Sequence, residues 1–172
     1  MKSLILFGDS HLGRFSRRWM KMVEENVKDT IVCNCAAGGL YAFDCINQAY
    51  LLSKLKPDYV VISLGGNDAS RPKQITPKSF EESMNKIVDT FKGSKVILFP
   101  CPTERESKSG DLKPYNEVLK KISKNKKIGI IDSEKVYGDL LKKNQNYHEE
   151  DGIHFNDLGY ETLTKEIINK IK

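Results

Sequence analysis

Five short apolar runs, rich in β-branched residues and separated by longer polar segments, constrain the fold of this chain more than any other feature. The runs cover residues 4–7, 30–35, 58–64, 95–100 and 127–132. Runs that are apolar at nearly every position suit strands buried on both faces, as in a parallel sheet. We therefore expect five parallel strands.

Segments with the apolar spacing of helices lie between these runs and after the last one. The expected helices cover residues 12–23, 41–55, 76–91, 114–122 and 156–171. Thr76 or Ser79 is a suitable N-cap, Gly93 a suitable stop, and Pro114 fits a helix start. Strands alternating with helices imply right-handed βαβ units. The sequence thus predicts the α/β class, as a three-layer α/β/α sandwich with helices on both faces of the sheet.

The length of 172 residues favours one domain, residues 1–172, with a single sizeable core. The net charge of +5 is not gathered into one basic run, so we expect a solvated lysine-rich surface and no nucleic-acid partner. No apolar stretch reaches about 18 residues, so no membrane span is expected. The sequence does not indicate an oligomeric state.

The four cysteines lack a nearby histidine or second cysteine at zinc spacing. We expect free thiols, mostly buried, in a reducing compartment. The apolar run at residues 4–7 is too short for the core of a secretory signal. These features predict a cytoplasmic protein without a metal.

Polar residues and glycines follow the expected strands, at the edge of a parallel sheet where ligands bind. After the first run comes Gly8-Asp9-Ser10-His11. Gly8 allows a tight turn, and Ser10 then lies at the start of a helix with its hydroxyl exposed, as a nucleophile requires. Alternatively, Asp9 or Ser10 is only the N-cap of that helix.

The second and third runs are followed by Gly38-Gly39 and by Asn67-Asp68. Adjacent glycines let backbone N–H groups approach a ligand, and an asparagine amide can stabilise an oxyanion. Either segment is also compatible with an ordinary turn.

Asp151 and His154 stand three residues apart near the end of the chain. Asp151 can accept a hydrogen bond from Nδ1–H of His154 and leave Nε2 free to act as a base. Taken alone, the pair is equally compatible with a polar turn before a helix. Together the segments supply a nucleophile, a base, its orienting carboxylate and oxyanion donors in the order Ser, Asp, His, although no Gly-x-Ser-x-Gly elbow is present.

These segments resemble the four conserved blocks of the SGNH (GDSL-like) hydrolase superfamily. The matching residues are Gly8-Asp9-Ser10, Gly39, Gly65-x-Asn67-Asp68 and Asp151-x-x-His154. The resemblance implies a flavodoxin-like fold and a serine ester hydrolase that needs no cofactor. It implies that Ser10 is the nucleophile, His154 the base and Asp151 its support. The implied oxyanion donors are the backbone N–H groups of Ser10 and Gly39 and the side chain of Asn67.

Four neighbours of these residues are candidates for substrate binding: Asp9, His11, Gly38 and Asp68. His11 departs from the family pattern, which often has a small or aliphatic residue there, and it either lines the pocket or points to solvent. Asp9 and Asp68 are expected to hold loop backbone rather than transfer protons. Residues 101–116 either form a substrate loop or lid or have no role.

The expected activity is hydrolysis of a small-molecule ester with a short acyl group, such as an O-acetyl ester of a sugar. A lysophospholipase or thioesterase of the same family is the alternative within enzymes. A ligand-binding module that keeps the fold without turnover is the alternative outside them.

Overall fold

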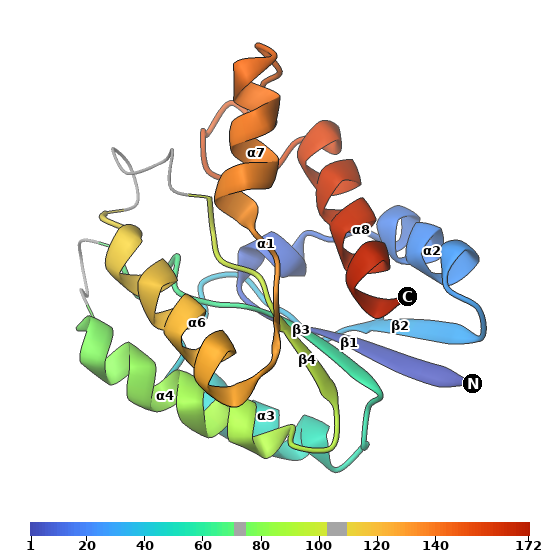
Figure 1. The fold of residues 1–172 in the computed structure, drawn as a ribbon, viewed down its shortest axis with the longest axis vertical. Coiled ribbons are helices and arrows are strands. Elements are labelled where there is room, and N and C mark those ends of the chain that lie inside the picture. The colour runs from blue at the N-terminus through green and yellow to red at the C-terminus, as the bar shows by residue number, and fades with distance from the viewer. Residues whose placement is uncertain (71–74, 103–109) are drawn as a thin grey trace.

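The computed structural model describes residues 1–70, 75–102 and 110–172. A five-stranded sheet runs through the molecule in the order β2-β1-β3-β4-β5, and every neighbouring pair is parallel (Figure 1). Its strands are β1 (Lys2–Gly8), β2 (Thr30–Asn34), β3 (Tyr59–Ser63), β4 (Lys95–Leu98) and β5 (Gly129–Ile130). This is the flavodoxin-like order, whose reversal falls between β1 and β3. Residues that leave β1 and β3 therefore border the crevice where ligands bind.

Helices cover both faces of the sheet and so form the outer layers of the predicted sandwich (Figure 1). One face packs against α3 (Cys45–Ser53), α4 (Pro77–Thr90) and α6 (Lys113–Lys126). The other face packs against α1 (Ser10–Gly13), α2 (Arg17–Asn26), α7 (Ser133–Lys142) and α8 (Asp157–Ile171).

Side chains of the central strands alternate between the two cores. In β1, Ile5 and Phe7 belong to the core under α3, α4 and α6, whereas Leu4 and Leu6 belong to the core on the opposite face. All four are at most 3% exposed. Burial on both faces explains why the run is apolar at every position, as expected for a parallel strand.

The end of β1 approaches β3 so closely that only glycine fits there. Gly8 pairs with Ser63 and has a φ of 129°. A Cβ at Gly8 would lie 1.9 Å from the carbonyl oxygen of Ser63. Since no side chain can occupy that space, Gly8 fixes how the chain leaves the sheet toward Ser10.

Three elements differ from the sequence-based expectation. The first helix is divided, because α1 ends at Gly13 and α2 begins at Arg17. The expected strand 127–132 is reduced to two residues, because Lys127 ends α6 in the left-handed conformation and Asp132 caps α7. Helix α7 itself was not predicted.

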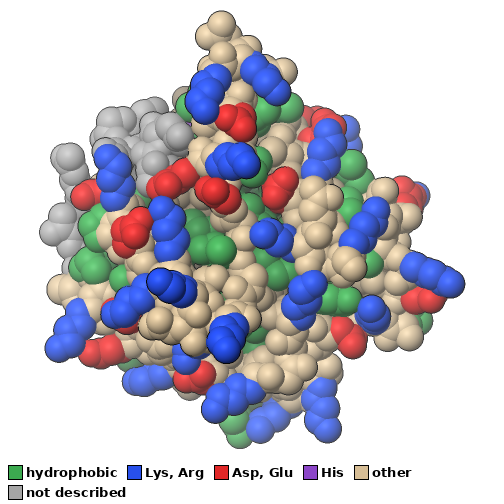
Figure 2. All heavy atoms as spheres, viewed as in Figure 1, with side chains coloured by type: hydrophobic (Ala, Val, Ile, Leu, Met, Phe, Trp, Pro, Cys, Tyr) green, Lys and Arg blue, Asp and Glu red, His purple; other side chains and the backbone are tan. Residues whose placement is uncertain are grey.

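The surface carries its positive charge in dispersed form. In the view of Figure 2, lysine and arginine side chains are spread over the face and alternate with acidic ones. Many are paired on the surface, as in Arg18 with Asp157 at 2.8 Å. None of the helices formed by the described residues is long and apolar enough to cross a membrane.

Candidate active site

Ser10 lies where the chain turns from β1 into α1. Asp9 caps this helix: its Oδ1 accepts hydrogen bonds from the backbone N–H of His11 and from Oγ of Ser63, both at 3.1 Å. The Asp9 carboxylate thus joins the ends of β1 and β3. With its neighbours fixed in this way, Ser10 begins the helix and stays partly exposed.

The structure brings Ser10, His154 and Asp151 together. Oγ of Ser10 lies 3.0 Å from Nε2 of His154, although the two residues are 144 positions apart in sequence. Nδ1 of His154 lies 2.6 Å from Oδ2 of Asp151. Because a carboxylate only accepts, Nδ1–H donates to Asp151, and Nε2 presents its lone pair to the Ser10 hydroxyl.

Asp151 is held in its charged form. Its Oδ1 accepts from the backbone N–H groups of Ile153, at 2.6 Å, and His154, at 2.8 Å, while Oδ2 accepts from the His154 ring. Partial burial raises the pKa of the Asp151 carboxyl, but these hydrogen bonds and the electrostatic interaction with the His154 ring lower it more, so the pKa lies well below its usual range. An ionised Asp151 both orients the imidazole and stabilises an imidazolium.

Two aromatic side chains anchor the segment that carries Asp151 and His154. Tyr147 and Phe155 are fully or nearly fully buried in the core next to α8. Backbone hydrogen bonds close the segment between them: N–H of Glu149 donates to the carbonyl of His154 at 2.8 Å, and N–H of Asn156 donates to that of Tyr147 at 3.1 Å. The polar turn is therefore fixed on both sides by hydrophobic burial.

Gly38 and Gly39 lie on the loop after β2. A Cβ at Gly38 would lie 3.8 Å from Cβ of Ser10, so the backbone of Gly38 borders the Ser10 side chain. Gly39 follows with a φ of 77°, which favours glycine. Nδ2 of Asn67 donates to the carbonyl of Leu40 at 3.0 Å and so attaches the loop after β3 to this glycine loop. The three expected sources of oxyanion donors therefore lie on neighbouring segments.

The side chains of Asp9 and Asp68 are buried. They are 1% and 0% exposed. Both carboxylate oxygens of Asp68 accept from the backbone N–H of Ala42, at 3.1 and 3.3 Å. Burial raises the pKa of Asp68 to about 6, although the N–H donors oppose this shift. Their hydrogen bonds to backbone N–H groups agree with the expectation that both carboxylates hold loop backbone. Their burial disfavours direct contact with a substrate.

His11 is buried, with 3% of its surface exposed, so the alternative that it points to solvent is wrong. Its Nε2 lies 3.5 Å from Sγ of Cys101 and its Nδ1 3.5 Å from Oδ1 of Asp9. Its ring centroid lies 5.1 Å from that of Phe155 and 6.1 Å from that of His154. Burial lowers the pKa of His11, but Cys101 and Asp9 raise it to about 10.

The buried contact between His11 and Cys101 was not predicted from the sequence. Each residue follows an apolar run, which was the available signal, but their pairing depends on the order of strands in the sheet. His148, the remaining one of the chain's three histidines, is half-buried and forms a β-bridge with Phe155.

The candidate substrate loop at 101–116 is only partly covered by the structure, because residues 103–109 lie outside the described residues. Cys101 and Leu112, at its two ends, are buried. Within the described part of the chain, no group of three or more histidine, cysteine or acidic side chains is placed to hold a metal ion.

Comparison with known structures shows the same fold in several hydrolases. A lipase/acylhydrolase from Enterococcus faecalis matches with a TM-score of 0.85 and 25% identity, over 99% of this chain and 95% of the other. The acetylxylan esterase Axe2 from Geobacillus stearothermophilus matches with a TM-score of 0.82 and 19% identity, over 99% and 94%. The carbohydrate acetylesterase Est24 from Sinorhizobium meliloti matches with a TM-score of 0.76 and 18% identity, over 99% and 98%.

Comparison with curated protein sequences finds no match. The family model of the GDSL-like lipases and acylhydrolases matches residues 6–162, a range that contains every residue of the candidate site. The chain therefore belongs to the GDSL-like lipase/acylhydrolase family of carboxylic ester hydrolases.

Proposed function

We propose that this protein hydrolyses short-chain carboxylic esters through a covalent acyl-enzyme on Ser10. The observation that carries the proposal is the continuous hydrogen-bonded series from Oγ of Ser10 through the His154 ring to the Asp151 carboxylate, at 3.0 and 2.6 Å. A serine hydroxyl is a weak nucleophile until an adjacent base removes its proton. His154 is the base that lies within reach.

In the first half of the reaction, Oγ of Ser10 attacks the ester carbonyl carbon while Nε2 of His154 takes the hydroxyl proton. The tetrahedral intermediate collapses, the bond to the alcohol oxygen breaks, and His154 gives its proton to the departing alcohol. Water then attacks the acyl-enzyme with His154 again as base, and the acid is released from Ser10. Asp151 stays ionised throughout.

The negative oxygen of each intermediate needs hydrogen-bond donors in fixed positions. The N–H groups of Ser10 and Gly39 and the amide of Asn67 are the proposed donors. The hydrogen bond from Asn67 to the carbonyl of Leu40 uses one of its two N–H groups. The other remains for the oxyanion.

The proposed preference for a short acyl group is supported by two of the similar structures, Axe2 and Est24, which are described as esterases that remove acetyl groups. Initial rates on p-nitrophenyl acetate and p-nitrophenyl octanoate test this preference. A higher kcat/KM for the acetate agrees with the proposal. A higher value for the octanoate would instead favour a lysophospholipase or thioesterase.

Replacing the nucleophile tests the proposal itself. Ser10→Ala should lower kcat on p-nitrophenyl acetate by about 10⁴-fold or more, as removal of a serine nucleophile does in other hydrolases. Ser16→Ala is the matched control, because Ser16 is exposed and its hydroxyl makes no capping hydrogen bond in α2. If Ser10→Ala and Ser16→Ala turn over the ester equally, Ser10 is not the nucleophile.

A further inference from the structure

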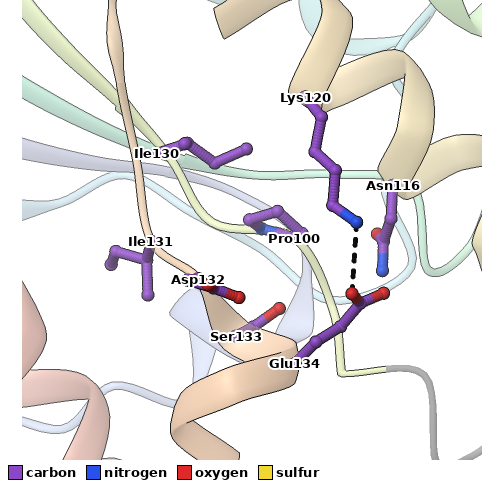
Figure 3. Close-up of a pocket in the computed structure, with 8 residues that line it drawn as sticks. All are labelled: Pro100, Asn116, Lys120, Ile130, Ile131, Asp132, Ser133 and Glu134. Atoms are coloured by element: carbon purple, nitrogen blue, oxygen red, sulfur yellow. Dashed lines mark hydrogen bonds and ion pairs between the residues drawn. The ribbon is translucent and has the colours of Figure 1, made fainter.

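A cavity of about 300 Å³ opens beside the carboxyl ends of β4 and β5, between α6 and α7. Figure 3 shows its lining: Pro100 at the end of β4, Asn116 and Lys120 from α6, and Ser133 and Glu134 from the first turn of α7. Its volume is at the lower end of the range for ligand sites. Among the described residues, those that line the cavity are distinct from the residues of the candidate active site.

Ser133 indicates that the cavity takes a polar ligand. The residue is 2% exposed, yet its Oγ has no hydrogen-bond partner among the described residues. Its own backbone N–H is used, because it donates to the carbonyl of Ile131 at 2.9 Å. In Figure 3 the Ser133 hydroxyl is directed into the cavity. Leaving a buried hydroxyl unpaired is unfavourable, and a ligand that bonds to it removes this cost.

The other polar groups of the cavity select for a ligand that donates hydrogen bonds. Nδ2 of Asn116 donates to the carbonyl of Cys101 at 2.8 Å, and the same amide carries an oxygen that can accept a hydrogen bond. Oε2 of Glu134 accepts a hydrogen bond from the Lys120 ammonium at 3.1 Å. Oε1 of the same carboxylate is a second acceptor for a ligand. Asp132 adds a second carboxylate. Two carboxylates against one ammonium disfavour phosphates and carboxylates as ligands.

The cavity also has an apolar part. Pro100 and the partly buried Ile130 line one side of it. A ligand with several hydroxyl groups on its edge and C–H groups on its face suits both sets of neighbours. A neutral sugar ring has this construction, whereas a simple amine would leave the apolar side without a contact.

The distance of the cavity from Ser10 indicates whether the sugar ring that it binds is the one that carries the acyl group. Strands in a sheet are about 4.8 Å apart, so β4 and β5 lie roughly 10 and 14 Å across the sheet from β1. Buried contacts connect the two places: Asn116 of the cavity donates to the carbonyl of Cys101, and Sγ of Cys101 contacts His11, the residue after Ser10. A ring whose acyl group reaches Ser10 therefore lies outside the cavity, and another ring of the same saccharide can enter it.

We propose that the cavity is a subsite for a neutral sugar ring of an oligosaccharide ester, at a distance from the ring that carries the acyl group. The expected effect of this subsite on kcat/KM rests on the proposed ester hydrolysis. Binding of the sugar itself does not depend on the identity of the nucleophile, so the two proposals can fail separately.

The kinetic test compares acetylated xylotetraose and acetylated xylose with p-nitrophenyl acetate. In the parent, kcat/KM should be higher for the tetraose ester than for the xylose ester. In Ser133→Ala and in Glu134→Gln, this preference should fall by about 3- to 10-fold, as expected for loss of one hydrogen bond to a ligand. Glu117→Gln is the matched control, since Glu117 also binds Lys120, at 2.8 Å, but lies outside the cavity. It should keep the full preference and the parent's rate on p-nitrophenyl acetate.

Calorimetry with unacetylated xylotetraose measures binding without hydrolysis. Ser10→Ala protein should bind the tetraose, and the double variant Ser10→Ala/Ser133→Ala should bind it about 3- to 10-fold more weakly. No chain-length preference in the parent, an undiminished preference in Ser133→Ala, or equal binding by the single and double variants would each overturn the subsite. Active Ser10→Ala protein with intact tetraose binding would overturn the proposed nucleophile and leave the subsite standing.

Discussion

At the scale of single residues, the site depends on side chains that perform two tasks at once. Asn67 attaches the loop after β3 to the glycine loop through the carbonyl of Leu40, and its second N–H group is a proposed oxyanion donor. Asp151 fixes its own turn through two backbone N–H groups while it orients His154. Loop structure and chemistry are thus set by the same polar groups.

Replacement of Asn67 separates its two tasks. Asn67→Ala should lower kcat by about 10²–10³-fold, the usual effect of deleting one oxyanion donor, with a much smaller change in KM. Loss of the loop attachment should reduce the free energy of unfolding by only about 1 kcal/mol. Steady-state kinetics and urea unfolding measure the two effects, and Asn26→Ala on the exposed end of α2 is the control. A kcat within about threefold of the parent's would exclude Asn67 as a donor.

His11 should contribute to stability through burial. His11→Ala leaves a cavity between Phe155 and Cys101 and removes a partner of buried Asp9, so it should lower the free energy of unfolding by about 3 kcal/mol. Arg14→Ala, at an exposed position just after α1, should change it by less than about 0.5 kcal/mol. Urea midpoints compare the two variants. Equal midpoints would show that the buried imidazole contributes nothing to stability.

The sequence predicted which residues form the site more accurately than it predicted how the neighbouring side chains are oriented. Ser10, Asp151 and His154 were identified because each falls in a short motif, and the strand order then brought them within hydrogen-bonding distance. The orientation of His11 was mistaken, because it depends on Cys101, which is 90 residues away in sequence. Local patterns carry no information on such a contact.

At the scale of elements, Asp68 joins two loops at the edge of the sheet. Its carboxylate, after β3, accepts from the N–H of Ala42, just before α3. Burial raises its folded pKa to about 6 from an ordinary value of 3.8. Its contribution to stability is therefore fully present below about pH 4 and is lost as the pH rises through about 6.

The pH dependence of this contribution can be measured against a variant that does not titrate. Relative to Asp68→Asn, the parent should lose about 2–3 kcal/mol of unfolding free energy between pH 4 and pH 7. Urea unfolding of both proteins at the two pH values gives this difference, and other titrating groups cancel in it. A difference that stays constant with pH would contradict the raised pKa.

Element boundaries were predictable where a cap or breaker stands in the sequence. Thr76, one of the two expected caps, caps α4, and Asn156, where the last helix was expected to begin, caps α8. Helix α7 was overlooked, although Asp132 is a suitable cap and Tyr137 packs against the sheet. The apolar residues of α7 follow directly after the apolar run at 127–132. The sequence pattern therefore gives no clear boundary between the end of the strand and the start of this helix.

At the scale of the whole molecule, the site joins the two ends of the chain across one sheet. Ser10 leaves the sheet beside Gly8, whereas His154 is held by the buried rings of Tyr147 and Phe155 in the core under α8. Activity therefore requires that this core and the sheet be intact together. The apolar runs in the sequence were sufficient to predict the fold class. The dependence of the His154 segment on this core is visible only in the contacts between segments that are distant in sequence.

Loss of activity should accompany global unfolding. Because Tyr147 and Phe155 share a core with β1 and α8, the His154 segment should not detach before the sheet unfolds. Hydrolysis of p-nitrophenyl acetate and far-ultraviolet circular dichroism, followed over the same urea series, should give the same midpoint. Activity lost at clearly lower urea would show that the segment opens independently.

Covalent labelling by a fluorophosphonate, followed by mass spectrometry of the proteolytic peptides, examines the meeting of Ser10 and His154 without assuming any substrate. We predict one adduct on the folded protein, on the peptide that contains Ser10, and none on Ser10→Ala or on protein unfolded in urea. An adduct on another residue, or equal labelling of folded and unfolded protein, would contradict the assignment of Ser10 as a nucleophile activated by His154.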